Sequence, residues 1–154
     1  MTSDTATFDL HRILPLTPEK LWHVMTDAKQ REKWGAPDDA TVLVVDSSDL
    51  REGGQDRHRC GPTDAPDFLV DTRWYHLSAP TRAVFTETLI LGGDPAFTSL
   101  VTYALTPTED GTALDISVAT SSFSGPDALR EVEGGWTGAL NKLKAYAEQL
   151  LVRH

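Results

Sequence analysis

One carboxylate in an otherwise apolar strand pattern is the residue best suited to chemistry in this sequence. Residues 82–91 read RAVFTETLIL, and every second position from Ala83 onward is apolar except Glu87. Because side chains alternate between the two faces of a strand, Glu87 would lie in an apolar row. Burial raises the pKa of a carboxyl group, so Glu87 could act as an acid or base, or orient a ligand. The alternative is a twisted strand in which Glu87 reaches solvent or pairs with Arg73 or Arg82.

A second candidate for proton transfer lies in the stretch DFLVDTRWYHL, residues 67–77. Trp74 and His76 are two residues apart, so a regular strand would place them on one face, with Tyr75 on the other. Both faces carry apolar residues, so the periodicity does not decide which face points inward. Pointing inward, His76 could donate or accept a proton near neutral pH. The alternative is an aromatic side chain at a sheet edge beside a solvated histidine.

Two further aromatic residues could contact a ligand. Tyr103 sits between Val101 and Leu105 on an apolar face, and a buried hydroxyl requires a hydrogen-bond partner that a ligand could supply. Trp136 opens the apolar stripe of the last segment and could close one end of a cavity. Packing in the core is the alternative for both.

The sequence does not predict a metal or cofactor site. His58 and Cys60 would share one face of a strand, but a closed zinc site needs four ligands and an open one three. Cys60 is the only cysteine, and His11, His23 and His154 have no motif spacing. The sequence also lacks a phosphate-binding loop, a dinucleotide fingerprint and a nucleophile elbow.

The elements that must position these residues follow from periodicity and turn chemistry. A strand over residues 6–14 precedes two short helices, the first capped by Thr17 with Pro18 at its first position, and the second covering Ala28 to Trp34. About six strands rich in β-branched and aromatic residues follow, separated by short turns that suit antiparallel neighbours. These strands are expected within residues 41–46, 51–61, 67–77, 81–91, 98–106 and 112–120.

The last segment predicts one long helix that begins near Ser124. Its apolar residues recur at spacings of four and three, which define a single face. This stripe consists of Trp136, Leu140, Leu143, Ala147 and Leu150. Gly134 and Gly135 would permit a close approach to the sheet or a bend. The order of elements indicates an α+β fold.

The helix stripe must pack against the sheet, which is the only surface large enough to cover it. A twisted antiparallel sheet can curl around one helix and leave a hollow, and such hollows are common small-molecule sites. The residues predicted to contact a ligand there are Trp74, His76, Phe85, Glu87, Tyr103, Trp136 and Leu140.

The length and charge of the chain indicate which kinds of partner are unfavourable. The 154 residues fit a single domain spanning 1–154, and a net charge of −9 disfavours nucleic acid and anionic membranes. There is no apolar run near the ~20 residues of a membrane span and no export signal at the N-terminus. With one cysteine and thus no internal disulfide, a cytoplasmic location is expected.

Segments along almost the whole chain resemble one superfamily. They are PEKLWHVMTD followed by Trp34, then EGG at 52–54, AP-TRAVFT with Pro80 and Thr86, SLVTYAL with Val101 and Thr102, EDGTALDI at 109–116 and GGW at 134–136. The sequence is similar to the START and birch-pollen-allergen superfamily with the helix-grip fold. Within it, the chain resembles the group named for the activator of heat-shock-chaperone ATPase homologue. The resemblance implies a curved antiparallel sheet gripping the last helix around a cavity, and the superfamily has no shared catalytic motif.

Three functions are compatible with these observations. The first is binding or carriage of an apolar or aromatic small molecule in the cavity. The second is a cyclase- or hydrolase-type enzyme that uses Glu87 or His76 for proton transfer. The third, suggested by the family name, is a chaperone-interacting module, and a homodimer is left open as well.

Overall fold

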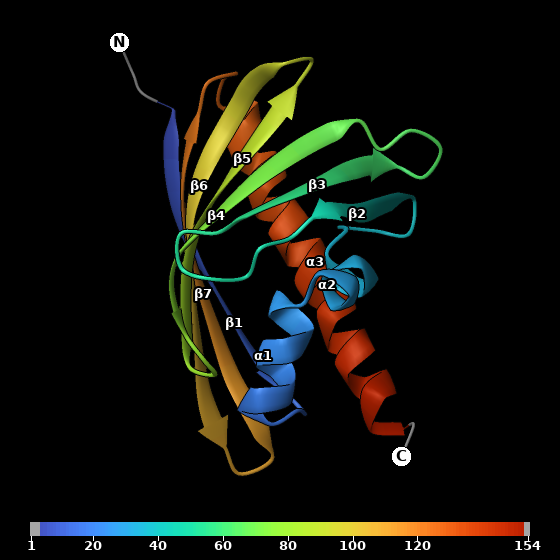
Figure 1. Cartoon of the computed structure of the whole chain (residues 1–154), viewed down its shortest axis with the longest axis vertical. Helices are drawn as coiled ribbons and strands as arrows, with labels where there is room; N and C mark the ends of the chain where they lie inside the picture. Colours follow the sequence, from blue (N-terminus) through green and yellow to red (C-terminus); the bar gives the residue numbers. More distant parts are fainter. Residues whose placement is uncertain (1–3, 153–154) are drawn as a thin grey trace.

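A seven-stranded antiparallel sheet forms one wall of the protein, in the order β1-β7-β6-β5-β4-β3-β2 (Figure 1). The computed structural model describes residues 4–152. The strands are β1 Thr5–Leu14, β2 Thr41–Ser47, β3 Gln55–Pro62, β4 Phe68–Ser78, β5 Arg82–Leu91, β6 Asp94–Thr108 and β7 Gly111–Ser122. The first strand therefore lies beside the last one, while β2 forms the opposite edge.

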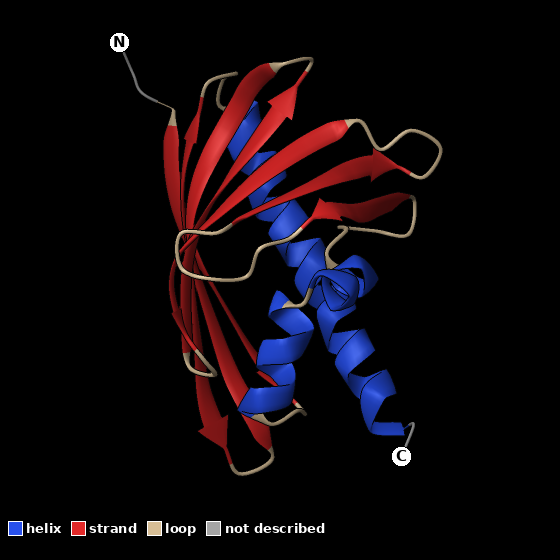
Figure 2. Ribbon diagram, viewed as in Figure 1, coloured by secondary structure: helices blue, strands red, loops and turns tan. Residues whose placement is uncertain are grey.

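All three helices lie on the same side of the curved sheet (Figure 2). They are α1 Pro18–Thr26, α2 Ala28–Trp34 and α3 Asp127–Val152. Thr17 caps α1 by accepting a hydrogen bond from the Lys20 backbone N–H, and Pro18 occupies the first turn, as predicted. Two short helices after the first strand, six further strands and a long final helix confirm the predicted α+β helix-grip fold. None of the helices within residues 4–152 is long and apolar enough to cross a membrane.

The core lies between α3 and the concave face of the sheet. Leu140, Leu143 and Ala147 of the α3 stripe are at most 1% exposed. They face a layer of fully buried strand residues, among them Val101 and Ile116. Buried residues of α1 and α2 belong to the same core. The two helices are joined by a hydrogen bond, because the Trp34 indole N–H donates to the Val24 carbonyl oxygen at 2.8 Å.

The close approach involving α3 occurs at Gly138 rather than at the two glycines expected from the sequence. A Cβ atom at Gly138 would lie 2.3 Å from the Pro37 carbonyl oxygen, so only glycine fits there. A Cβ at Gly134 or Gly135 would meet nothing within 4 Å, and α3 continues through both positions. These two glycines therefore provide open space beside the helix.

A bulge in β4 overturns the expectation that Trp74 and His76 share a face. Trp74 pairs with Phe85 and His76 with Val84, so the register shifts by one residue at Tyr75. Because one extra residue reverses the alternation of a strand, His76 turns away from the side that Trp74 occupies. Trp74 is 1% exposed, whereas His76 is exposed and its Nδ1 lies 3.4 Å from a Glu52 carboxylate oxygen.

Candidate functional site

A cavity of about 330 Å³ lies between the sheet and the first half of α3. Its walls come from α2, β2 to β6 and α3, and most of their surface is apolar. The bulky apolar side chains in the walls are Trp34, Leu43, Phe68, Val70, Leu89, Leu91, Phe97, Val132 and Trp136. Phe68, Leu91 and Glu131 line the cavity and are also exposed, so the cavity opens between the start of β4, the end of β5 and α3.

Glu87 is the carboxylic acid in the sheet wall of this cavity. It lies opposite Thr72 of β4 and Ser99 of β6, and the Ser99 hydroxyl hydrogen-bonds to Thr120 instead, at 2.7 Å. No hydrogen bond joins the Glu87 carboxyl group to any residue within 4–152. Burial raises the pKa of Glu87, and the positive charge of Arg31 acts in the opposite direction. This carboxyl group is therefore available to a ligand.

Tyr103 and Trp136 also line the cavity, at the end of a row of aromatic rings. Tyr103 packs edge-on against Phe85, with ring centroids 5.0 Å apart, and against Trp136 at 6.2 Å. Phe85 in turn contacts Trp74 at 4.9 Å. Burial raises the pKa of the Tyr103 hydroxyl, and the Glu87 carboxyl group adds to this effect. Tyr103 thus stays protonated and can donate a hydrogen bond.

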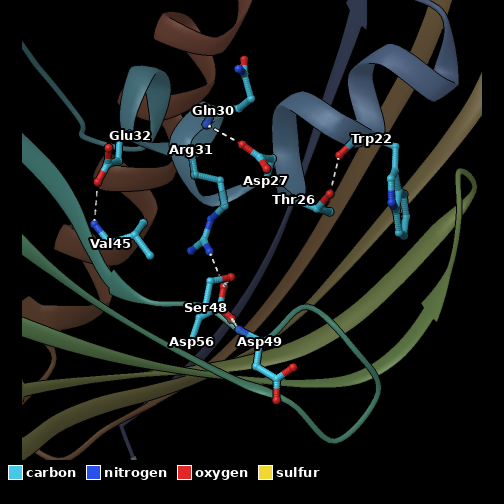
Figure 3. Close-up of polar contacts among 10 residues, drawn as sticks. All are labelled: Trp22, Thr26, Asp27, Gln30, Arg31, Glu32, Val45, Ser48, Asp49 and Asp56. Atoms are coloured by element: carbon cyan, nitrogen blue, oxygen red, sulfur yellow. Dashed lines mark hydrogen bonds and ion pairs between the residues drawn. The ribbon is translucent and has the colours of Figure 1, made fainter.

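A buried ion pair that the sequence reading missed lies at the α2 side of the cavity. Arg31 of α2 lines the cavity and is 6% exposed, and its Nη1 donates to Asp56 of β3 at 2.9 Å. Figure 3 shows Arg31 reaching from the helix to Asp56. The available sequence signals were weak: Arg31 lies three residues before the apolar Trp34 on the same helix, and Asp56 alternates with His58.

His58 and Cys60 lie on the cavity side of β3, as their spacing suggested. Burial, with a smaller effect from Arg31, lowers the pKa of His58 to about 3, so its ring is neutral at physiological pH. Burial, with a smaller effect from Glu87, raises the pKa of the Cys60 thiol to about 11. Both groups are therefore uncharged, and the described residues contain no group of three His, Cys, Asp or Glu side chains that could hold a metal ion.

The seven residues proposed from the sequence separate into three groups. Glu87, Tyr103 and Trp136 line the cavity. Trp74, Phe85 and Leu140 are at most 2% exposed and belong to the packed core behind it. His76 lies outside the cavity beside Glu52, so it cannot transfer a proton to a ligand bound there.

One family model matches most of the chain. Residues 15–148 match the sequence model described as Activator of Hsp90 ATPase homolog 1-like protein. No curated protein matches the chain.

Solved structures that resemble the chain come from several bacteria. A protein of Chromobacterium violaceum is 25% identical, with a TM-score of 0.80 over 92% of this chain and 96% of its own. A protein of Rhizobium loti is 28% identical, with a TM-score of 0.80 over 94% of this chain and 99% of its own. An AHSA1-like protein from Aeromonas hydrophila, 20% identical, has the same fold, with a TM-score of 0.75 over 97% of this chain and 96% of its own.

Proposed function

The chain belongs to the family of Activator of Hsp90 ATPase homolog 1-like proteins, and we propose that it binds a largely apolar small molecule in the cavity between the sheet and α3. The observation that carries this proposal is the cavity itself. Its volume of about 330 Å³ lies near the lower end of the range of small-molecule sites, which is roughly 300–1,000 Å³. Apolar walls with a few converging polar groups are typical of such sites. The ligand is therefore a small molecule, such as a compound with two fused aromatic rings.

Two neighbouring glycines of α3 allow a matched test of this proposal. Gly135 lines the cavity and a side chain there would extend into open space, whereas Gly134 is exposed and does not line it. Gly135→Leu should fill part of the cavity and weaken binding, while Gly134→Leu changes helix propensity equally and leaves the cavity open. Fluorescence titration with 2-ethylnaphthalene, 2-acetylnaphthalene and 2-naphthoate measures the affinity.

We expect at least one of these probes to bind with a stoichiometry of one to one. Gly135→Leu should lower its affinity by about tenfold or more, the effect expected from losing roughly 1.4 kcal/mol of contact, and Gly134→Leu should not. Equal affinities for the two variants would place binding outside the cavity and contradict the proposal.

A second candidate function, a cyclase- or hydrolase-type enzyme, is favoured by the environment of Glu87. This group has a raised pKa, lines the cavity and has no hydrogen-bond partner within residues 4–152, as suits a general acid or base. In an enzyme, Glu87→Gln keeps the shape and should lower turnover by ~10²–10⁴-fold, with little change in affinity. In a carrier, the same substitution alters affinity or stability, and no turnover is found in the parent protein.

A chaperone-interacting module is the third candidate, and it follows from the family name alone. The cavity is the feature that separates these candidates, because a carrier or an enzyme needs an open cavity and an interaction module does not. Chaperone binding that persists in Gly135→Leu would therefore favour the third candidate.

A further inference from the structure

The guanidinium group of Arg31 is held in place from two sides. Nη1 donates to Asp56 Oδ2 at 2.9 Å, and the guanidinium carbon lies 5.9 Å from the centroid of the Trp74 ring. Asp56 has no exposed surface and also accepts hydrogen bonds from the Ser48 hydroxyl at 3.0 Å and the Asp49 backbone N–H at 2.8 Å (Figure 3). These contacts fix Asp56, so Asp56 in turn fixes the direction of the Arg31 side chain.

Part of the Arg31 donor capacity remains unused. A guanidinium group carries five N–H donors. Within residues 4–152, Nε and Nη2 of Arg31 have no acceptor, and neither atom is sealed inside the protein. The side chain is almost fully buried and lines the cavity, so a ligand in the cavity can approach these donors.

A ligand that fills the cavity would shield these donors from solvent and must itself supply an acceptor for them. A pure hydrocarbon would leave charged N–H groups without acceptors, and an unsatisfied charged group costs more than the net gain of an ordinary hydrogen bond. An oxygen atom on the ligand removes this penalty. We propose that Arg31 determines ligand specificity, and that the ligand carries an acceptor oxygen on its apolar frame which accepts hydrogen bonds from the Arg31 guanidinium group.

This inference rests on the proposed binding function and adds the chemical class of the ligand. The acceptor could be a neutral carbonyl oxygen or a carboxylate. The titratable side chains around Arg31 are Asp56 and His58 of β3, Glu87 of β5 and Tyr103 of β6. Asp56 already compensates the charge of Arg31, and Glu87 is a second acid in the cavity, so we expect a neutral carbonyl oxygen to bind more tightly than a carboxylate.

The test removes the ion pair as a unit, because Arg31→Met alone would leave Asp56 buried and unpaired. The double variant Arg31→Met/Asp56→Asn removes both charges. The asparagine oxygen can accept from the Asp49 backbone N–H, and its amide N–H can donate to the Ser48 hydroxyl oxygen. Its fold is checked by circular dichroism. Three probes with the same two-ring frame are titrated: 2-acetylnaphthalene with a carbonyl group, 2-naphthoate with a carboxylate, and 2-ethylnaphthalene with no oxygen.

The double variant should bind the two oxygen-bearing probes about 10- to 100-fold more weakly, as expected for a lost hydrogen bond to a charged group. Its affinity for 2-ethylnaphthalene should stay the same or rise. Arg31→Lys, which keeps a positive charge beside Asp56, is the second variant, and it should also weaken only the oxygen-bearing probes.

Equal loss for all three probes, or no loss for any, would overturn the specificity role of Arg31 while leaving the binding function intact. Failure of all three probes to bind the wild-type protein would instead contradict the proposed function. The ratio of wild-type affinities for 2-acetylnaphthalene and 2-naphthoate identifies which acceptor the site prefers, and either oxygen-dependent result supports the role of Arg31.

Discussion

At the scale of single residues, burial in the cavity wall shifts two titratable groups in opposite directions. The pKa of Glu87 rises above its ordinary value of 4.5, and that of His58 falls from 6.5 to about 3. The contribution of Glu87 to stability is complete below pH 4.5 and is lost as the pH rises through its pKa in the folded state. The contribution of His58 is complete above pH 6.5 and is lost as the pH falls towards 3. Both groups are therefore uncharged over part of the acidic range.

The first prediction concerns the pH dependence caused by His58. Between pH 3 and 6.5 the unfolded chain binds a proton at this residue and the folded protein does not, so stability should rise with pH. His58→Gln should reduce this slope by up to about 1.4 kcal/mol per pH unit, which is the effect of one proton. Urea unfolding at several pH values measures it.

The control for this prediction is His76→Gln, the same substitution at an exposed position. This substitution should leave the pH dependence of stability that His58 causes unchanged. A wild-type slope in the His58→Gln variant would show that His58 is protonated in the folded protein, and that its ring is less buried than the structure indicates.

At the scale of elements, α3 carries both the core stripe and one wall of the cavity. Its buried residues lie along one face, while Trp136 and Gly135 of the same helix line the cavity nearer its N-terminal end. The two roles overlap at Val132 and Ala139, which are buried and also line the cavity, but Leu143 belongs only to the core and Gly135 only to the cavity wall, so a substitution at either one tests a single role.

A substitution at Leu143 tests whether the apolar stripe of α3 packs in the core, since this side chain is fully buried. Leu143→Ala should lower the free energy of unfolding by ~2–5 kcal/mol, as loss of buried leucine side chains does. Leu151→Ala makes the same substitution on the same helix at a position that is 44% exposed, and it should cost less than about 0.5 kcal/mol. Thermal or urea unfolding measures both, and similar small losses would contradict the packing of α3 on the sheet.

Gly138 tests the contact between α3 and the segment after α2. A methyl group at this position would lie 2.3 Å from the Pro37 carbonyl oxygen, so Gly138→Ala should destabilise the protein by about 1–3 kcal/mol. Gly134→Ala meets no neighbour within 4 Å and should instead stabilise the helix by up to about 1 kcal/mol. Urea unfolding should therefore show changes of opposite sign in the free energy of unfolding for the two substitutions. If both substitutions stabilised the protein, α3 would have to lie further from Pro37 than the structure shows.

At the scale of the whole molecule, the net charge of −9 makes nucleic acid an unfavourable partner. Phosphate backbones are repelled by such a charge, so we predict no binding to DNA or RNA. Titration with labelled duplex DNA and single-stranded RNA at about 10–50 mM salt is the most sensitive condition, since electrostatic binding is strongest there. Micromolar binding that weakens with added salt would contradict this prediction.

The sequence by itself determined the order and type of the elements, because these depend on local patterns. The Thr17 cap and Pro18 mark the start of α1, and the spacing from Trp136 to Leu150 defines the packed face of α3. The uninterrupted alternation from Ala83 to Glu87 placed Glu87 in one row with Ala83 and Phe85, and in the structure Ala83 and Phe85 are buried and Glu87 lines the cavity.

Only the tertiary structure decided which polar groups meet in the cavity. The bulge at Tyr75 turns His76 outward, and it is visible only in the pairing of β4 with β5. Arg31 and Asp56 are 25 residues apart and meet because α2 packs on β2, which pairs with β3, an arrangement that no local pattern encodes. Strand alternation and helix periodicity are set by neighbours along the chain, whereas the polar side of the cavity depends on how distant elements pack together.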